Sequence, residues 1–219
     1  MKLAQAPLPP SLVIENFLPE PDRAALVEWA LASEEEFAPA GIFTGKGGRE
    51  HRLDPTFRKA LRHEGIGPFE ALFRKHLIAR SAEIASATGY RGPPPASFEF
   101  ELNAYGDGAH FRPHIDIPIG KNRRTVGAQE GEDRVISAVY YFYREPKAFS
   151  GGALRLYRFG ADAHAPGAEA ASIAFEPRQN ALVCFPSWAM HKVETVHCPS
   201  GRFADYRFGL NCWFCRPAN

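Results

Sequence analysis

The second half of the chain alternates apolar and polar residues with a period of two, and this pattern limits the fold more than any other feature. In FEFELN (98–103) the alternation is strict. Further short apolar segments follow, each set off by glycine, proline or charged residues: RVISAVYYFY (134–143), ALRLY (153–157), ASIAF (171–175), ALVCF (181–185), KVETV (192–196) and RFGLNCWF (207–214). Because neighbouring side chains of a strand point to opposite faces, these segments predict strands. Several short strands with such punctuation indicate an antiparallel sandwich or barrel.

The first half, residues 1–95, is predicted to be mainly helical. A short entry strand is expected at 12–17, followed by a helix that begins at Pro21 and runs to about Ser33. Proline suits a first helical turn because its missing N–H would be unpaired there. A second helix begins at Pro68, where apolar residues recur at spacings of three and four, and Gly89 is placed to end it.

Together the two halves predict an α+β fold in a single domain, residues 1–219. Residues 96–216 would form the core, a double-stranded β-helix (jelly-roll or cupin-like) of antiparallel strands. The N-terminal helices would pack on one of its sheets. With 219 residues, 45% of them hydrophobic, the chain is long enough for one sizeable core.

Composition excludes several partners. The formal net charge is +1, with acids and bases nearly balanced, so neither nucleic acid nor an anionic membrane is an expected partner. Apolar runs fall short of the roughly 20 residues of a membrane-spanning helix, and residues 1–10 lack the apolar stretch of a signal peptide. These features predict a cytoplasmic protein.

The four cysteines lie in the last quarter of the chain. Cys212 and Cys215 have CxxC spacing, and a zinc site that adds His197 and Cys198 is one interpretation. However, positions three apart in a strand face opposite sides, so buried reduced thiols are the preferred interpretation.

The segment NAYGDGAHFRPHIDIP (103–118) is the densest in groups that can bind a metal. In an extended strand His114 and Asp116 present an imidazole and a carboxylate to one point. Two histidines and one carboxylate form the facial triad of non-heme Fe(II) oxygenases, which leaves coordination positions free. A His-x-Asp pair alone is weak evidence, but His191, on a later predicted segment, can supply the second histidine.

An anchor for an organic acid is also present. Arg207 begins a strand on which Arg207, Gly209, Asn211 and Trp213 share one face. An unpaired arginine there would be costly to bury, and a guanidinium binds a carboxylate through two hydrogen bonds. The partner is either a bound dicarboxylate or an Asp or Glu of the protein, and the arginine alone does not distinguish them.

With these pieces in order, the chain resembles the prolyl-4-hydroxylase-like branch of the 2-oxoglutarate- and Fe(II)-dependent dioxygenases. The resemblance covers about residues 98–214 and depends on YGDGAHFRPHID, RVISAVYYF, SGGALRLY, NALVCFPSWAMHKV and RFGLNCWF, in the family's order. It implies Fe(II), 2-oxoglutarate and O₂ as cofactors, with ascorbate as an optional reductant.

The resemblance also implies roles for single residues. His114, Asp116 and His191 match the iron ligands. Arg207 and Tyr141 match the residues that bind the distal carboxylate of 2-oxoglutarate, and Tyr105 matches a tyrosine that lines the same pocket. The stretch HCPSGRFADY is longer than the common pattern, which makes Arg202 a rival anchor. Arg207 is preferred because it keeps its spacing to the tryptophan of the strand.

The implied reaction is hydroxylation of a C–H bond, coupled to conversion of 2-oxoglutarate to succinate and CO₂. By analogy the substrate is a residue, such as proline, in a protein or peptide; a free amino acid or other small molecule is the alternative. The charged stretch 117–133 is interpreted either as a substrate lid or as a solvated loop. A non-catalytic module that binds metal or 2-oxoglutarate and a zinc hydrolase are the rival functions.

Overall fold

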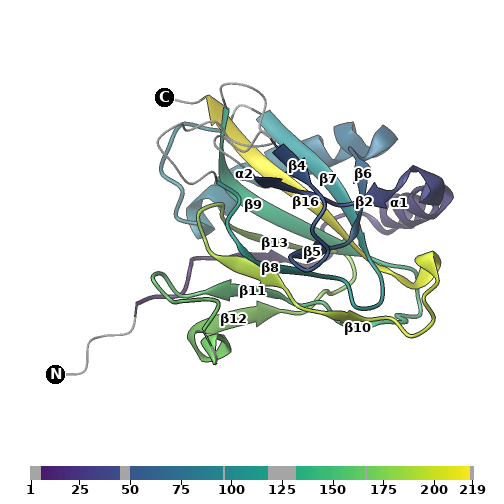
Figure 1. Cartoon of the computed structure of the whole chain (residues 1–219). Coiled ribbons are helices and arrows are strands. Elements are labelled where there is room, and N and C mark those ends of the chain that lie inside the picture. The colour runs from purple at the N-terminus through teal and green to yellow at the C-terminus, as the bar shows by residue number, and fades with distance from the viewer. Residues whose placement is uncertain (1–5, 45–49, 96, 118–131, 166, 218–219) are drawn as a thin grey trace.

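The computed structural model describes residues 6–44, 50–95, 97–117, 132–165 and 167–217. It consists of two facing antiparallel sheets, with two α-helices against the larger one (Figure 1). None of the described helices combines the length and apolar character needed to cross a membrane.

The larger sheet has seven strands, and every neighbouring pair is antiparallel. In spatial order the strands are β1 (Leu12–Ile14), β13 (Ala181–Pro186), β9 (Glu132–Phe142), β16 (Arg207–Pro217), β7 (Ser97–Tyr105), β6 (Leu61–Glu64) and β2 (Ala38–Pro39). The last strand of the chain, β16, thus lies in the middle, between β9 and β7.

The smaller sheet has five strands, again antiparallel. Their order is β12 (Ser172–Phe175), β11 (Leu154–Tyr157), β14 (His191–Val193), β8 (His110–His114) and β5 (Arg58–Lys59). Two further antiparallel pairs of short strands are described: β3 (Ile42–Thr44) with β4 (Glu50–Arg52), and β10 (Ser150–Gly151) with β15 (Val196–His197). The predicted double-stranded β-helix is therefore confirmed.

The main apolar core lies between the helices and the outer face of the larger sheet. Helices α1 (Glu20–Ala32) and α2 (Glu70–Ala87) contribute fully buried residues such as Leu26 and Phe73. They belong to one cluster with the alternate residues of β16: Phe208, Leu210, Cys212 and Phe214. The other residues of β16 face the smaller sheet, as the alternation predicts, so one face of this strand stabilises the fold and the other is left for function.

Helix α2 begins and ends where the sequence predicts. A 3₁₀ turn, Gly67–Phe69, leads into it, with Pro68 in a first-turn position. At its end Gly89 has φ +71°, and its N–H and that of Tyr90 donate to the carbonyls of Ser86 and Ala85. Glycine adopts this left-handed conformation without strain, so the last carbonyls of the helix are satisfied.

The structure corrects two local predictions. The described part of residues 1–95 contains six short strands as well as the helices, and β2, β5 and β6 extend the two sheets. Strands of two to four residues are too short for a period of two to be visible. The predicted strand 192–196 is divided between β14 and β15, with a register irregularity between His191 and Val193.

Two isoleucines of α2 test how far this core determines stability. Ile84 is fully buried, whereas Ile78 is 60% exposed. We expect Ile84→Ala to lower the free energy of unfolding by about 3 kcal/mol, because it removes buried methyl groups and leaves a cavity. Ile78→Ala is the matched control and should change it by less than about 0.5 kcal/mol. Urea unfolding followed by circular dichroism measures both, and equal effects would contradict this core assignment.

Candidate metal centre and its surroundings

Two histidines from different strands lie directly opposite each other in the smaller sheet. His191, at the start of β14, pairs with His114, at the end of β8, and their ring centroids are 4.2 Å apart. Asp116 follows β8, outside the strand, because the strand ends at His114. The sequence prediction that one strand carries both His114 and Asp116 is corrected to this extent.

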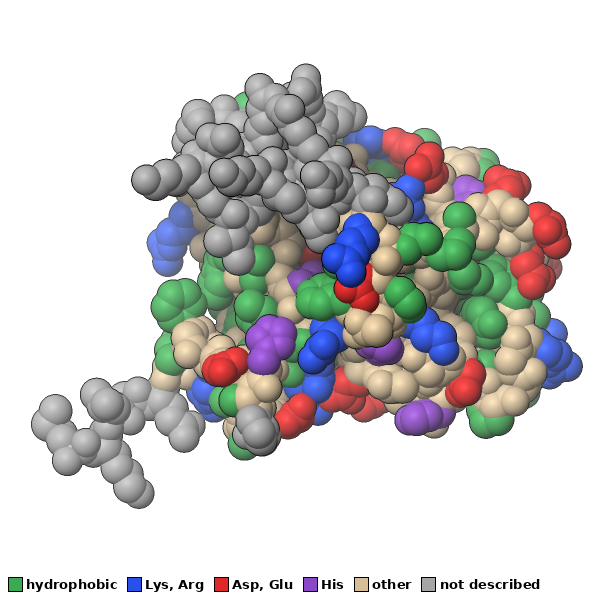
Figure 2. Space-filling view, in the orientation of Figure 1, with side chains coloured by type: hydrophobic (Ala, Val, Ile, Leu, Met, Phe, Trp, Pro, Cys, Tyr) green, Lys and Arg blue, Asp and Glu red, His purple; other side chains and the backbone are tan. Residues whose placement is uncertain are grey.

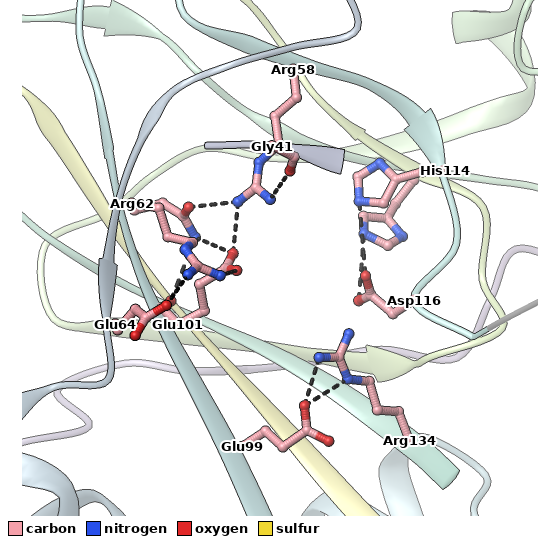
Figure 3. Close-up of polar contacts among 11 residues, drawn as sticks. Gly41, Arg58, Arg62, Glu64, Glu99, Glu101, His114, Asp116 and Arg134 are labelled. Carbon is pink, nitrogen blue, oxygen red and sulfur yellow. Dashed lines mark hydrogen bonds and ion pairs between the residues drawn. The ribbon is translucent and has the colours of Figure 1, made fainter. Parts of the chain in front are cut away.

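The three side chains nevertheless converge. The Nε2 atom of His114 is 3.8 Å from one Asp116 oxygen, and the Nε2 atom of His191 is 3.7 Å from the other. One donor atom from each residue lies within 4.8 Å of the other two, and no other group of this kind occurs among the residues that the structure describes. Figure 3 shows the Asp116 carboxylate turned toward the imidazole of His114.

Main-chain carbonyls orient both imidazoles. The Nδ1–H of His114 donates to the carbonyl of Arg112 at 2.8 Å, and that of His191 donates to the carbonyl of Ala189 at 2.9 Å. A carbonyl can only accept, so Nδ1 carries the proton and the lone pair of Nε2 points to the shared site. Phe111 stacks on His114 with centroids 3.6 Å apart, which holds the ring from its face.

The charge states suit metal binding. Burial, with the neighbouring His191 as the next cause, lowers the pKa of His114 to about 3. Burial alone would raise the pKa of Asp116, but His191, His114 and Arg134 outweigh it and lower that pKa to about 2. At neutral pH the site therefore offers an unprotonated imidazole and an ionised carboxylate, which are the forms that bind metals.

A buried arginine lies between two tyrosines on the inner face of the larger sheet. The Arg207 side chain is 1% exposed, and its Cζ lies 4.7 Å from the ring centroid of Tyr105 and 4.8 Å from that of Tyr141. Two glycines make room for it: a Cβ on Gly152 would lie 2.9 Å from Arg207 Cδ, and one on Gly209 would lie 3.0 Å from Nη1.

This arginine has no carboxylate partner in the described part of the chain. Its Nε and Nη2 atoms, and the hydroxyl of Tyr141, are buried without a hydrogen bond to any described residue. The alternative of a salt bridge within the protein is thus not observed for these residues. Arginine stays charged at any relevant pH, so a buried guanidinium with free donors calls for an anion.

The rival anchor Arg202 and two further histidines near the proposed ligands, His110 and His197, lie outside the metal group. The Arg202 side chain is 69% exposed and pairs with Asp205 at 2.7 Å. The ring of His110 contacts the carbonyls of Gly108 and Thr56, and His197 is exposed on β15. All four cysteines are buried and lie outside the metal group, so the CxxC zinc interpretation gains no support from the described residues.

Charged pairs that the sequence analysis missed surround the metal centre (Figure 3). Arg58 of β5 donates to Glu101 and to Asn103 of β7, at 2.6 Å each. Arg134 of β9 donates to Glu99 at 2.6 Å. The guanidinium of Arg134 also covers the ring of Trp213, 3.6 Å from its centroid. The inner chamber is therefore polar, and these particular charges are paired.

A cavity of about 400 Å³ opens beside the residues that follow α2. Ile117, which follows Asp116, lines it together with Tyr90, Arg134, Trp188 and Arg216. Trp188 is 44% exposed and contacts the exposed Phe159 edge-on. On the face shown in Figure 2, acidic and basic side chains are interspersed and do not gather in one patch of a single charge.

Comparisons with known proteins agree with this geometry. The family model of the 2OG-Fe(II) oxygenase superfamily matches residues 100–215. An uncharacterized PKHD-type hydroxylase of the cyanobacterium Synechocystis is 29% identical over 206 residues, 94% of this chain. The chain spans 63% of the length of that relative.

Solved structures share the fold. A prolyl-4-hydroxylase of Pseudomonas putida is 25% identical with a TM-score of 0.57, over 94% of this chain and 93% of that chain. A prolyl hydroxylase of Trichoplax adhaerens, solved with a peptide of hypoxia-inducible factor, is 14% identical with a TM-score of 0.64, over 94% and 83%. A viral collagen prolyl hydroxylase of Paramecium bursaria Chlorella virus-1, solved with 2OG, is 14% identical with a TM-score of 0.58, over 95% and 97%.

Paired histidine variants test the metal centre. We expect His114→Ala to weaken Mn²⁺ binding by more than roughly 100-fold. Removing a hydrogen-bond partner of a ligand commonly lowers metal affinity by about 10- to 100-fold, and removing the ligand itself should lower it further. His110→Ala, on the same strand, is the matched control and should bind Mn²⁺ like the wild type, since its ring contacts the carbonyls of Gly108 and Thr56 and lies outside the metal group. Calorimetric titration of the metal-free proteins measures both affinities. Weakening by His110→Ala, with no effect of His114→Ala, would refute this centre.

Proposed function

The chain belongs to the 2OG-Fe(II) oxygenase superfamily, and from this membership we propose that it hydroxylates a C–H bond of a residue in a protein or peptide. It is accordingly an oxidoreductase that uses Fe(II), 2-oxoglutarate and O₂. In the proposed reaction, oxidation of the substrate is coupled to conversion of 2-oxoglutarate to succinate and CO₂. The substrate and this coupling are the parts that we propose.

His114, Asp116 and His191 are the proposed iron ligands. Two neutral imidazoles and one carboxylate are the donor set of the facial triad, which suits Fe(II) and leaves positions open for other ligands. When bound, the iron with 2-oxoglutarate supplies the O₂ chemistry that oxidises a C–H bond. The residues themselves contribute orientation: the carbonyls of Arg112 and Ala189 fix the imidazoles before any metal binds.

Arg207 and Tyr141 are the proposed anchor for the distal carboxylate of 2-oxoglutarate. The observation that carries this assignment is the buried guanidinium with two unbonded donor atoms beside an unbonded Tyr141 hydroxyl, among the described residues. Burial raises the pKa of Tyr141 to about 12, so its hydroxyl keeps its proton and can donate. A carboxylate placed there would satisfy both groups at once.

The anchor and the metal centre share one chamber. Ser137 and Tyr141 lie on the same face of β9, and the Ser137 hydroxyl contacts Asp116. The ring of Tyr105 closes the opposite side of the Arg207 guanidinium. A short diacid can therefore be held at one end by Arg207 while its other end points toward the metal, which is the orientation that 2-oxoglutarate requires.

Two observations support a protein or peptide substrate. A prolyl-4-hydroxylase is among the similar structures at 25% identity. The cavity that Ile117 lines reaches the exposed ring of Trp188, so a peptide would have room beside the residue that follows Asp116. The stretch 117–133, interpreted above as either a substrate lid or a solvated loop, lies outside the described residues from 118 to 131.

A free amino acid or other small molecule is the second candidate. The polar chamber favours it, because the pairs Arg58–Glu101 and Arg134–Glu99 could contact the charged groups of a small zwitterion.

A cytoplasmic location stays a prediction from the sequence.

Substrate-dependent release of succinate tests the reaction. The purified protein, with Fe(II) and 2-oxoglutarate, should release succinate faster when proline-containing peptides are added than when free amino acids are added. Mass spectrometry of the peptide should show a gain of one oxygen. Stimulation by free amino acids alone would favour the small-molecule alternative. Failure of Asp116→Ala to abolish succinate release would contradict the assigned triad.

Two arginine variants test the anchor. We expect Arg207→Ala to raise the 2-oxoglutarate concentration needed for half-maximal rate by roughly 100-fold, because it removes charged hydrogen bonds to a buried carboxylate. Arg202→Ala is the matched control and should leave this concentration unchanged, since Arg202 is exposed and pairs with Asp205. Steady-state kinetics with varied 2-oxoglutarate measures both. The reverse result would transfer the anchor to Arg202.

A further inference from the structure

Two serine hydroxyls form a hydrogen-bonded chain behind the Asp116 carboxylate. Ser137 is 1% exposed on β9, and Ser187 is fully buried in the turn after β13. The Ser137 Oγ lies 2.6 Å from Asp116 Oδ2 and 2.9 Å from Ser187 Oγ. An ionised carboxylate can only accept, so Ser137 donates to Asp116, and its oxygen accepts the proton of Ser187. The chain therefore has one direction, from Ser187 to Asp116.

Ser187 also holds the main chain of Asp116. The Asp116 N–H donates to the carbonyl of Ser187 at 3.0 Å, and the Ser187 N–H donates to the carbonyl of Val135 at 3.2 Å. Asp116 lies beyond the end of β8, so the strand pairing of the smaller sheet does not fix it. The position of Asp116 instead depends on the turn after β13, and β13 is a strand of the larger sheet.

The same turn orients a second candidate ligand. The Ala189 carbonyl accepts the hydrogen bond from His191 Nδ1–H at 2.9 Å. The Ala189 N–H donates in turn to the carbonyl of Pro186 at 2.9 Å, which closes the turn. One short segment, 186–189, thus contacts both Asp116 and His191.

We propose that Ser137 and Ser187 are positioning residues of the metal centre, which hold the Asp116 carboxylate in its binding orientation before a metal arrives. The carboxylate of an aspartate can rotate about the Cβ–Cγ bond, and a short hydrogen bond to an ionised oxygen restricts that rotation. Partners of this kind commonly account for a factor of 10 to 100 in metal affinity. The inference rests on the metal-binding role proposed above and is independent of the substrate.

The metal affinity of the metal-free protein tests the proposal. Mn²⁺ is the probe, titrated calorimetrically with neither 2-oxoglutarate nor substrate present. We expect Ser137→Ala to weaken Mn²⁺ binding by roughly 10- to 100-fold. Ser137→Thr keeps the hydroxyl and should restore most of the affinity. A folded Ser137→Ala protein that binds Mn²⁺ like the wild type would overturn the proposal.

Ser187→Ala provides a second, milder test, because it does not touch the carboxylate. It should weaken Mn²⁺ binding by less than Ser137→Ala does. The double variant should bind no more weakly than Ser137→Ala alone, since the Ser187 hydroxyl acts through Ser137. Fully additive losses would contradict the directional chain.

Ser33→Ala is the matched control, since Ser33 is a buried serine at the end of α1, 6% exposed. It should bind Mn²⁺ like the wild type. Thermal unfolding of each metal-free variant checks the fold. If the Mn²⁺ affinity fell in step with stability in every variant, Ser33→Ala included, a positioning role would be rejected. Failure of the wild type to bind Mn²⁺ would instead contradict the proposed metal-binding function.

Discussion

The pairing of β14 with β8 is the constraint on which the metal centre depends. It places His191 directly opposite His114, although the two are far apart in the sequence. Strand β11 pairs with the other edge of β14 and sets His191 opposite Leu156. A slip by one residue would turn His191 to the other face of the sheet. The register is therefore fixed from both sides, and the two imidazoles face one point.

The larger sheet divides its two faces between stability and chemistry. On the outer face, β16 buries apolar residues such as Leu210 and Phe214 against the helices. On the inner face the same strand carries Arg207, whose buried charge costs free energy while its donors are unpaired. The rings of Tyr105 and Tyr141 offset part of that cost. An anion that completes the pairing would stabilise the folded protein, so binding and stability are linked.

The sequence predicts those features that follow from periodicity or from a short motif. The alternation in β16 separates Phe208 from Arg207, and the structure places the two on opposite faces. The serines of the hydrogen-bonded chain could not be found in this way. Ser137 was recognisable only as a residue on the face of Tyr141, and nothing local connects it to Ser187. Arg58 was missed because its strand has two residues and no visible pattern.

The ion pairs of the chamber contribute little to the stability of the fold and are better explained by recognition of a polar substrate. Arg58 and Glu101 are both largely buried, as are Arg134 and Glu99. Taking such charges out of water costs about as much as their attraction returns, and apolar residues of similar volume would commonly stabilise a fold equally well. We propose a second role for them, because fixed charges orient a polar substrate group without reorganising. In this proposal the inner face combines the metal site and the acid anchor with walls suited to polar main-chain or zwitterionic groups.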